Sequence, residues 1–121
     1  MPQLQLHGRL WLTLDGNNFL GRGRVELLER IRATGSIAQA ARAMKMSYKA
    51  AWDAMDAMNN AWGRPLVASA TGGKGGGGTL LTEDAETLIA AFRRWEEDHR
   101  RFLGGLDLAS PAVPAERKPS A

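Results

Sequence analysis

The sequence of 121 residues contains no cysteine, which excludes disulfide bonds and thiolate metal sites. Its two histidines, His7 and His99, lie far apart, and no group of histidine and acidic residues has the spacing of a metal site. No pairing of a nucleophile with a general base stands out either. We therefore expect no metal, no cofactor and no enzymatic activity.

Long apolar runs are missing as well. No run approaches the roughly 20 residues that span a membrane. The N-terminus, MPQLQLHGRLW, lacks the cationic start and the continuous apolar core of a signal peptide. We therefore expect a cytoplasmic protein that does not interact with membranes, and a chain of this length forms one domain with a modest core.

The net charge of +3 is small but unevenly distributed. Residues 36–81 carry five lysines and arginines and two aspartates, a net +3, whereas residues 82–106 carry four arginines and six acids, a net −2. A basic region of this kind is the electrostatic footprint of a nucleic-acid-binding domain. A solvated surface with a chance asymmetry would give the same small difference.

The most informative stretch covers residues 35–58 and reads GSIAQAARAMKMSYKAAWDAMDAM. Ser36 can cap a short helix, a turn follows at Lys45–Met46, and Ser47 can cap a second helix. This layout predicts a helix-turn-helix over residues 36–62, whose second helix enters the major groove of DNA. An ordinary helical hairpin in an α-helical core would have the same spacing.

The second helix has two distinct faces. Ala51, Met55 and Met58 form an inward stripe at helical spacing. On the outward face, Lys49 can donate to guanine, and Asp53 can either accept from cytosine or orient Lys49. Trp52 can meet a thymine methyl group or belong to the core. The residues of the helix-turn-helix that we expect at DNA are Ser36, Gln39, Ser47, Tyr48, Lys49, Trp52 and Asp53.

A glycine-rich segment follows the helix-turn-helix. Residues 66–70 and 79–81 can form two short strands that a glycine tip joins, which predicts a wing over residues 66–81. Glycine lets backbone N–H groups approach a phosphate closely. The tip matches neither the Walker A spacing nor the context of a dinucleotide-binding motif, and the flanking apolar strands argue against a flexible linker. The tip residues expected at DNA are Thr71, Gly72, Gly73, Lys74 and Gly75.

Leucines alternate with other residues near the N-terminus, which predicts one strand with a buried leucine face. Asp15–Gly16 is a hairpin-turn signal, and Phe19–Leu20 can form a short return strand. A helix is expected over residues 24–34, with its apolar residues turned inward. The alternating leucines are Leu4, Leu6, Leu10, Leu12 and Leu14, and the inward helix residues are Val25, Leu28 and Ile31.

Residues 82–104 predict one long helix that Thr82 caps. Its apolar residues recur at spacings of three and four and form a narrow seam. The seam either packs on its own domain or pairs with a second copy, and we expect a homodimer. The interface residues expected are Leu88, Phe92, Trp95, His99 and Phe102. Residues 107–121 contain three prolines and are expected to form a disordered tail.

The run SYKAAWDAMDAMN, followed by ATGGKGGGGTLLT, resembles the DNA-binding domain of the molybdate-responsive ModE regulators. The helix-turn-helix also resembles the LysR type, whose apolar residue in the turn region corresponds to Met44. The resemblance covers residues 10–106. It implies a mostly α fold with small β, namely a winged helix-turn-helix with an N-terminal β-hairpin and a long C-terminal dimerisation helix. Full-length ModE regulators also carry C-terminal oxyanion-binding domains, for which 121 residues leave no room.

The expected function is that of a sequence-specific regulator that binds double-stranded DNA. A domain over residues 1–106 would bind an inverted-repeat operator as a homodimer, in molybdenum-related gene control as the resemblance implies. Two alternatives stay open. One is an oxyanion-binding protein for molybdate or tungstate, although we do not expect tight binding by this chain. The other is a winged-helix interaction module without DNA.

Overall fold

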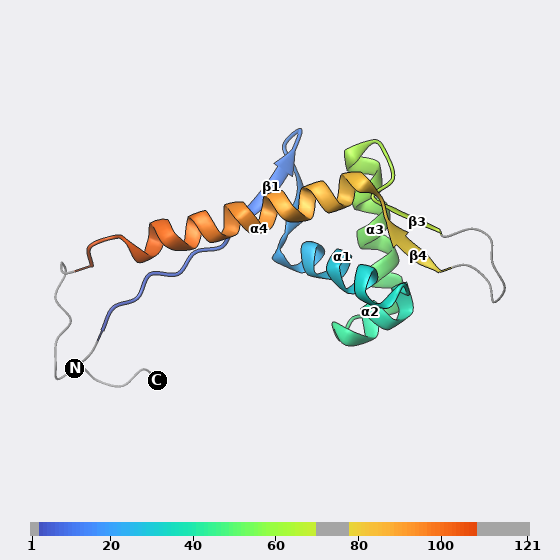
Figure 1. Cartoon of the computed structure of the whole chain (residues 1–121), viewed down its shortest axis with the longest axis horizontal. Coiled ribbons are helices and arrows are strands. Elements are labelled where there is room, and N and C mark those ends of the chain that lie inside the picture. The colour runs from blue at the N-terminus through green and yellow to red at the C-terminus, as the bar shows by residue number, and fades with distance from the viewer. Residues whose placement is uncertain (1–2, 70–77, 109–121) are drawn as a thin grey trace.

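The computed structural model describes residues 3–69 and 78–108 as a mostly helical fold with two small β-hairpins. Helices α1 to α3 gather with the second hairpin at one end of the molecule, and α4 extends away from them (Figure 1). This is a winged helix-turn-helix, as predicted. The elements in chain order are β1 (Trp11–Leu14), β2 (Asn17–Gly21), α1 (Arg22–Thr34), α2 (Ile37–Ala43), α3 (Tyr48–Trp62), β3 (Val67–Ser69), β4 (Thr79–Leu81) and α4 (Glu83–Gly104).

The predicted caps set the helix boundaries. The hydroxyl of Ser36 accepts a hydrogen bond from the backbone N–H of Gln39 at 3.1 Å, and that of Ser47 accepts from Ala50 at 3.0 Å. Thr82 caps α4 in the same way. In the turn between α2 and α3, Lys45 adopts the left-handed conformation with a φ of 56°. A residue with a Cβ atom is strained there, so the turn carries a local energetic cost.

The core lies where α1 packs against α2 and the first half of α4, and where α2 packs against α3. The inward faces predicted for residues 24–34 and for the second helix of the helix-turn-helix are confirmed, because their apolar residues are buried. The fully buried large side chains are Leu20, Val25, Leu27, Leu28, Ile31, Met58, Leu66 and Phe92. Within the described residues no helix is both long and apolar enough to cross a membrane.

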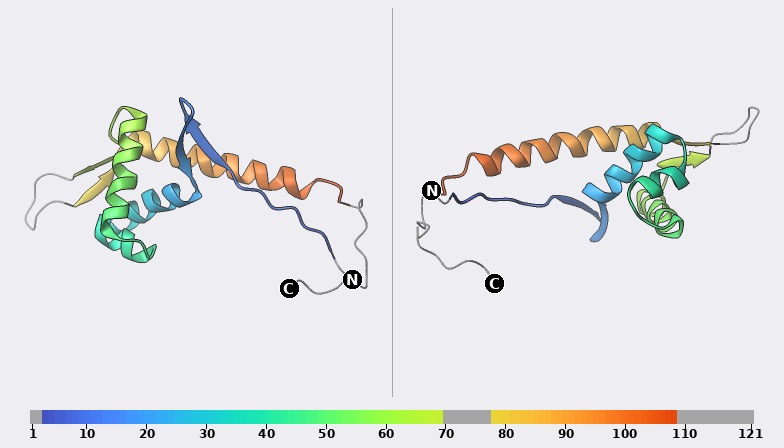
Figure 2. Two further views of the ribbon diagram at one scale, coloured as in Figure 1. Left: turned by 180° about the vertical axis from the view of Figure 1, so that it is seen from behind. Right: turned by 90° about the horizontal axis from the view of Figure 1, so that it is seen from below.

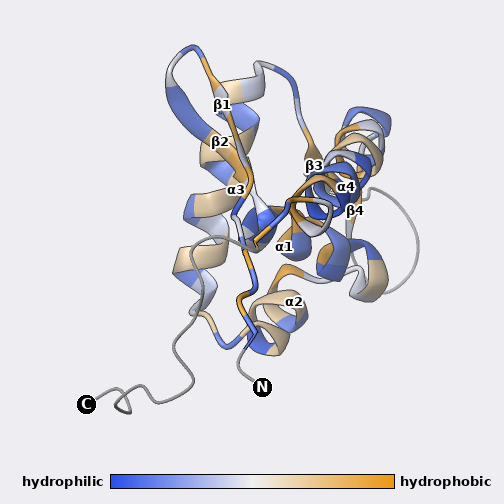
Figure 3. Cartoon of the chain, turned by 90° about the vertical axis from the view of Figure 1, so that its left-hand side faces the viewer, coloured by the Kyte–Doolittle hydropathy of each residue, from blue (hydrophilic) through white to orange (hydrophobic). Residues whose placement is uncertain are grey.

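The N-terminal strand is much shorter than its leucine pattern predicts. Only residues 11–14 form β1, which pairs antiparallel with β2. Residues 3–10 form no strand, and Leu4 and Leu6 are 45% and 44% exposed instead of buried. The segment runs beside the C-terminal half of α4 (Figures 1 and 2), and its hydrophobic and hydrophilic residues alternate (Figure 3). The prediction was wrong because β2 ends where α1 begins, which leaves these residues without a strand to pair with.

The seam predicted along α4 divides into two parts. Phe92 is fully buried and Leu88 packs against the core, because the first half of α4 covers α1 of the same chain. Phe92 therefore has no surface for a partner, and its assignment to a dimer interface was wrong. Farther along, Trp95 and Phe102 are exposed. His99 packs against Gly8 of the N-terminal segment. A Cβ atom at Gly8 would lie 2.8 Å from His99 Cε1, which is closer than ordinary van der Waals contact.

Candidate nucleic-acid interface

The first two turns of α3 carry two parallel rows of exposed side chains. Tyr48 and Trp52 form an aromatic row, in which the rings meet edge to face with centroids 6.1 Å apart. Lys49 and Asp53 form a charged row, in which Nζ lies 2.8 Å from Oδ2. The buried stripe of α3 anchors the opposite face of the helix in the core. The four side chains thus share one outward face, where a groove of DNA could reach all of them.

The charged row orients a cation without burying it. A hydrogen bond from Lys49 to Asp53, together with their charge attraction, raises the pKa of the Lys49 ammonium group. Their side chains are 85% and 63% exposed, so water screens the pair and its contribution to stability is small. Asp53 therefore orients Lys49 in the free protein, and Lys49 keeps further N–H donors for a base or a phosphate.

Three further polar residues predicted at DNA belong to the helix-turn-helix. The hydroxyls of Ser36 and Ser47 are engaged as helix caps, and Gln39 is exposed on α2. Two exposed cations of the helix-turn-helix, Arg42 and Lys45, were not predicted as contacts. Neither forms an ion pair inside residues 3–69 and 78–108, so both add positive charge to the helix-turn-helix.

The base of the wing is fixed to the helix-turn-helix. Asn59 Oδ1 accepts hydrogen bonds from the backbone N–H groups of Leu66 at 2.8 Å and Val67 at 3.4 Å. The backbone N–H of Thr79 donates to the carbonyl of Gly35 at 2.9 Å. These bonds hold β3 and β4 at a set distance from α3. Sequence reasoning missed the role of Asn59, because this residue lies within α3, seven residues before its nearest partner, Leu66.

A groove of about 360 Å³ separates α3 from the two wing strands. Tyr48 and Trp52 line it from α3, and Ser69 and Thr79 line it from β3 and β4. The charged row lies outside the groove, on the far side of the aromatic row. The tip residues predicted at DNA, Thr71, Gly72, Gly73, Lys74 and Gly75, lie outside the described residues.

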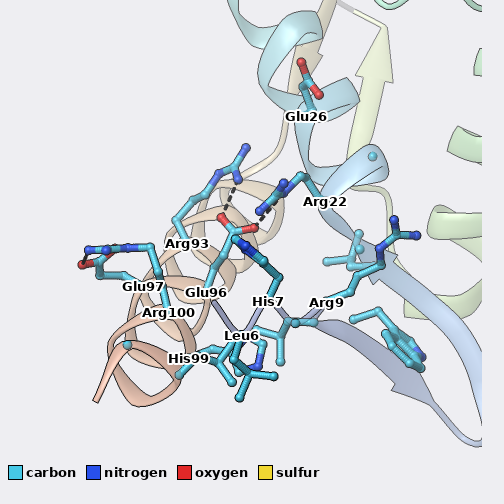
Figure 4. Close-up of a pocket in the computed structure, with 18 of the residues that line it drawn as sticks. Leu6, His7, Arg9, Arg22, Glu26, Arg93, Glu96, Glu97, His99 and Arg100 are labelled. Atoms are coloured by element: carbon cyan, nitrogen blue, oxygen red, sulfur yellow. Dashed lines mark hydrogen bonds and ion pairs between the residues drawn. The ribbon is translucent and has the colours of Figure 1, made fainter. Parts of the chain in front are cut away.

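A second and larger groove runs between the N-terminal segment and α4 (Figure 4). Arg22 Nε and Arg93 Nη1 both donate to Glu96, at 3.2 and 2.7 Å, and Arg93 also binds Glu29. Burial opposes ionisation of Glu96, but the hydrogen bonds from Arg93 and Arg22 outweigh it and hold the pKa of that carboxyl below its usual value. Three arginines of the lining, Arg22, Arg93 and Arg100, are each paired with an acid, whereas Arg9 and Arg24 form no ion pair within residues 3–69 and 78–108.

The end of α3 is tied to the start of α4. The indole N–H of Trp62 donates to Asp84 at 2.9 Å, and Arg64 Nε donates to the same carboxylate at 2.8 Å. These hydrogen bonds lower the pKa of the Asp84 carboxyl. The ring of Trp62 also stacks on Phe19, with centroids 5.8 Å apart. The orientation of α3 is therefore coupled to that of α4.

Comparison with known proteins agrees with this geometry. The family model of the bacterial regulatory helix-turn-helix proteins of the lysR family matches residues 23–86, from α1 to the first turn of α4. This family comprises regulators rather than enzymes, which confirms the expectation that the chain is not an enzyme.

Curated relatives share the same region. The molybdenum-pterin-binding protein MopB of Rhodobacter capsulatus is 46% identical over 97 residues, which are 80% of this chain and 36% of the relative. The molybdenum transport protein ModE of Azotobacter vinelandii is 43% identical over 106 residues, or 88% of this chain and 39% of the relative. The DNA-binding transcriptional dual regulator ModE of Escherichia coli is 45% identical over 83 residues, or 69% and 32%.

The chain thus spans between about a third and two fifths of the length of these relatives. The family match covers more than half of the chain and includes both helices of the helix-turn-helix and the described strands of the wing. The chain belongs to the LysR family of bacterial regulatory helix-turn-helix proteins, with a DNA-binding domain homologous to that of the ModE regulators.

Proposed function

We propose that this chain is a sequence-specific transcriptional regulator of the ModE type, which reads double-stranded DNA with the first two turns of α3. The observation that carries the proposal is the exposed face of Tyr48, Lys49, Trp52 and Asp53, which lies beside a wing whose base is bonded to the same helix-turn-helix. The wing tip, with Lys74, would contact a neighbouring phosphate without reading a base.

The regulated genes are proposed to concern molybdenum, and the protein to act in the cytoplasm. The support is the names of its relatives, which include a molybdenum transport protein and molybdenum-pterin-binding proteins beside transcriptional regulators. Because the chain covers only part of each relative, an oxyanion-binding role is not carried over. Arg22 of α1 and Arg93 of α4 are ion-paired with Glu96 and Glu29 and so provide no reason to restore it.

A homodimer is proposed to present two recognition helices to an inverted repeat. The support is apolar surface along the C-terminal half of α4, where Trp95 and Phe102 are exposed, just beyond its end, where Leu106 is exposed, and along the adjacent N-terminal segment, where Leu4 and Leu6 are exposed. A twofold axis through such a surface would relate the two α3 helices, and the operator would then repeat the same symmetry.

Selection from a randomised pool of duplex DNA tests the proposal. The full chain is expected to enrich one sequence motif arranged as an inverted repeat, and to bind it in gel shifts with an affinity that falls as salt rises. Enrichment of no motif, with equal and weak binding to all duplexes, would favour an interaction module over a DNA reader. Enrichment of a single asymmetric site would refute the symmetric dimer but keep DNA reading.

A further inference from the structure

The aromatic row of α3, Tyr48 and Trp52, lies outside the buried core. The residues are 54% and 38% exposed, whereas the face of α3 that packs in the core is supplied by Ala51, Met55 and Met58. Two aromatic rings held against each other at the surface leave apolar area in water, which is unfavourable unless a partner covers it. The position at the start of a recognition helix identifies that partner as DNA.

Trp62, at the end of the same helix, has a structural role that Trp52 lacks. Trp62 stacks on Phe19, and its indole N–H donates to Asp84. Trp52 has neither feature. Neither its N–H nor the Tyr48 hydroxyl donates a hydrogen bond to any residue of 3–69 or 78–108. The aromatic row is thus pre-arranged by its edge-to-face contact and engaged by nothing else in the described chain.

The major groove of DNA presents one apolar group, the 5-methyl group of thymine. All other recognition features at the base edges are hydrogen-bond donors and acceptors, which suit the charged row of Lys49 and Asp53 rather than the rings. We propose that Tyr48 and Trp52 determine specificity for thymine by covering one or more 5-methyl groups. This inference rests on the proposed function.

The arrangement of the two rows also orders the bases. Tyr48 and Trp52 line the groove between α3 and the wing strands, whereas Lys49 and Asp53 lie outside it. The thymine that meets the aromatic row therefore lies on the wing side of the base that Lys49 contacts. Each half-site should show the same order of these two bases, because both rows lie on one rigid helix.

The test uses the DNA site that the full chain selects, with each thymine replaced in turn by deoxyuridine. This replacement removes one methyl group and leaves every hydrogen-bonding group unchanged. Because burial of one methylene-sized group contributes about 0.8 kcal/mol, the affinity of the wild-type chain should fall about fourfold at each contacted thymine. Thymines outside the contact should tolerate the replacement, and they serve as controls in the same duplex.

Protein variants assign the effect to the aromatic row. In Trp52→Ala the preference for thymine over deoxyuridine should disappear at the affected position, whereas Tyr48→Phe, which keeps the ring, should retain it. Trp11→Ala is the matched control, because Trp11 is also an exposed tryptophan, at 56%, but lies on β1. Circular dichroism confirms that each variant is folded.

Three results would overturn the inference. If deoxyuridine is tolerated at every position of a tightly bound site, no methyl group is contacted, although the proposed function survives. If the preference persists unchanged in both Trp52→Ala and Tyr48→Ala, another residue reads the methyl group. A chain that selects no DNA site would overturn the proposed function and this inference together. The deoxyuridine replacements use only the wild-type chain, so they test the inference even if Trp52→Ala fails to fold.

Discussion

Two phenylalanines of α4 should respond oppositely to mutation, because one stabilises the fold and the other is available to a partner. Phe92 is fully buried between α4 and the core, whereas Phe102 is 64% exposed three turns later. Removing a buried phenylalanine side chain costs about 3–5 kcal/mol. Because a domain of this size is stable by about 5–15 kcal/mol, Phe92→Ala should lose about a fifth or more of the free energy of unfolding.

Phe102→Glu should leave the folded protomer almost unchanged, since surface substitutions typically stay within about 0.5 kcal/mol. In a dimer that covers Phe102, however, the glutamate would bury an unpaired charge and dissociate the two copies. Urea denaturation at low protein concentration measures the first effect, and sedimentation at micromolar concentration measures the second. A Phe92→Ala variant as stable as the wild type would refute the core assignment. A Phe102→Glu variant that stays dimeric would refute the proposed interface.

Three further predictions concern stability and ligands. Because hydrogen bonds lower the pKa of the Asp84 carboxyl, its contribution to stability is present above 3.8, the pKa in the unfolded chain, and is lost as the pH falls below that value. The wild type should therefore have a higher melting temperature than Asp84→Asn near neutral pH, and the two should converge on acidification; a difference that stays constant with pH would exclude this linkage. Lys45→Gly should raise the free energy of unfolding by about 1 kcal/mol by relieving the left-handed backbone, whereas Lys45→Ala should not, and equal denaturation midpoints for both would disprove local strain. Isothermal calorimetry should find no molybdate affinity tighter than about millimolar, because poorly preorganised groups hold a small anion weakly, and a micromolar dissociation constant would reveal an anion site that the paired arginines conceal.

Local signals predicted the helices well, because the groups that cap a helix lie within a few residues of its end. Ser36, Ser47 and Thr82 each cap the helix that the sequence assigns to them. The two wing strands were predicted to within one or two residues for the same reason, since a turn and its flanking strands are adjacent in the chain. The outward face of α3 followed from helical periodicity alone.

Partners distant in sequence were less predictable. The alternation of leucines in residues 3–10 indicates which side chains share a face, but it does not indicate whether a second strand is available. In the structure no strand pairs with residues 3–10. The seam of α4 indicates an apolar surface, but not whether the same chain covers that surface. At Phe92 the same chain does cover it. The bonds from Asn59 to β3 depend on tertiary placement in the same way.

Reading of DNA by α3 is tested most directly by footprinting Lys49→Ala on the selected site. Lys49 is exposed and hydrogen-bonded only to Asp53 among the described residues, so its removal should leave the fold intact. We expect specific binding to weaken by roughly 1–3 kcal/mol, the range for one good base contact. Arg94→Ala, which removes an exposed cation from α4, should bind as wild type does. An unchanged footprint for Lys49→Ala at the same protein concentration would contradict recognition by this face.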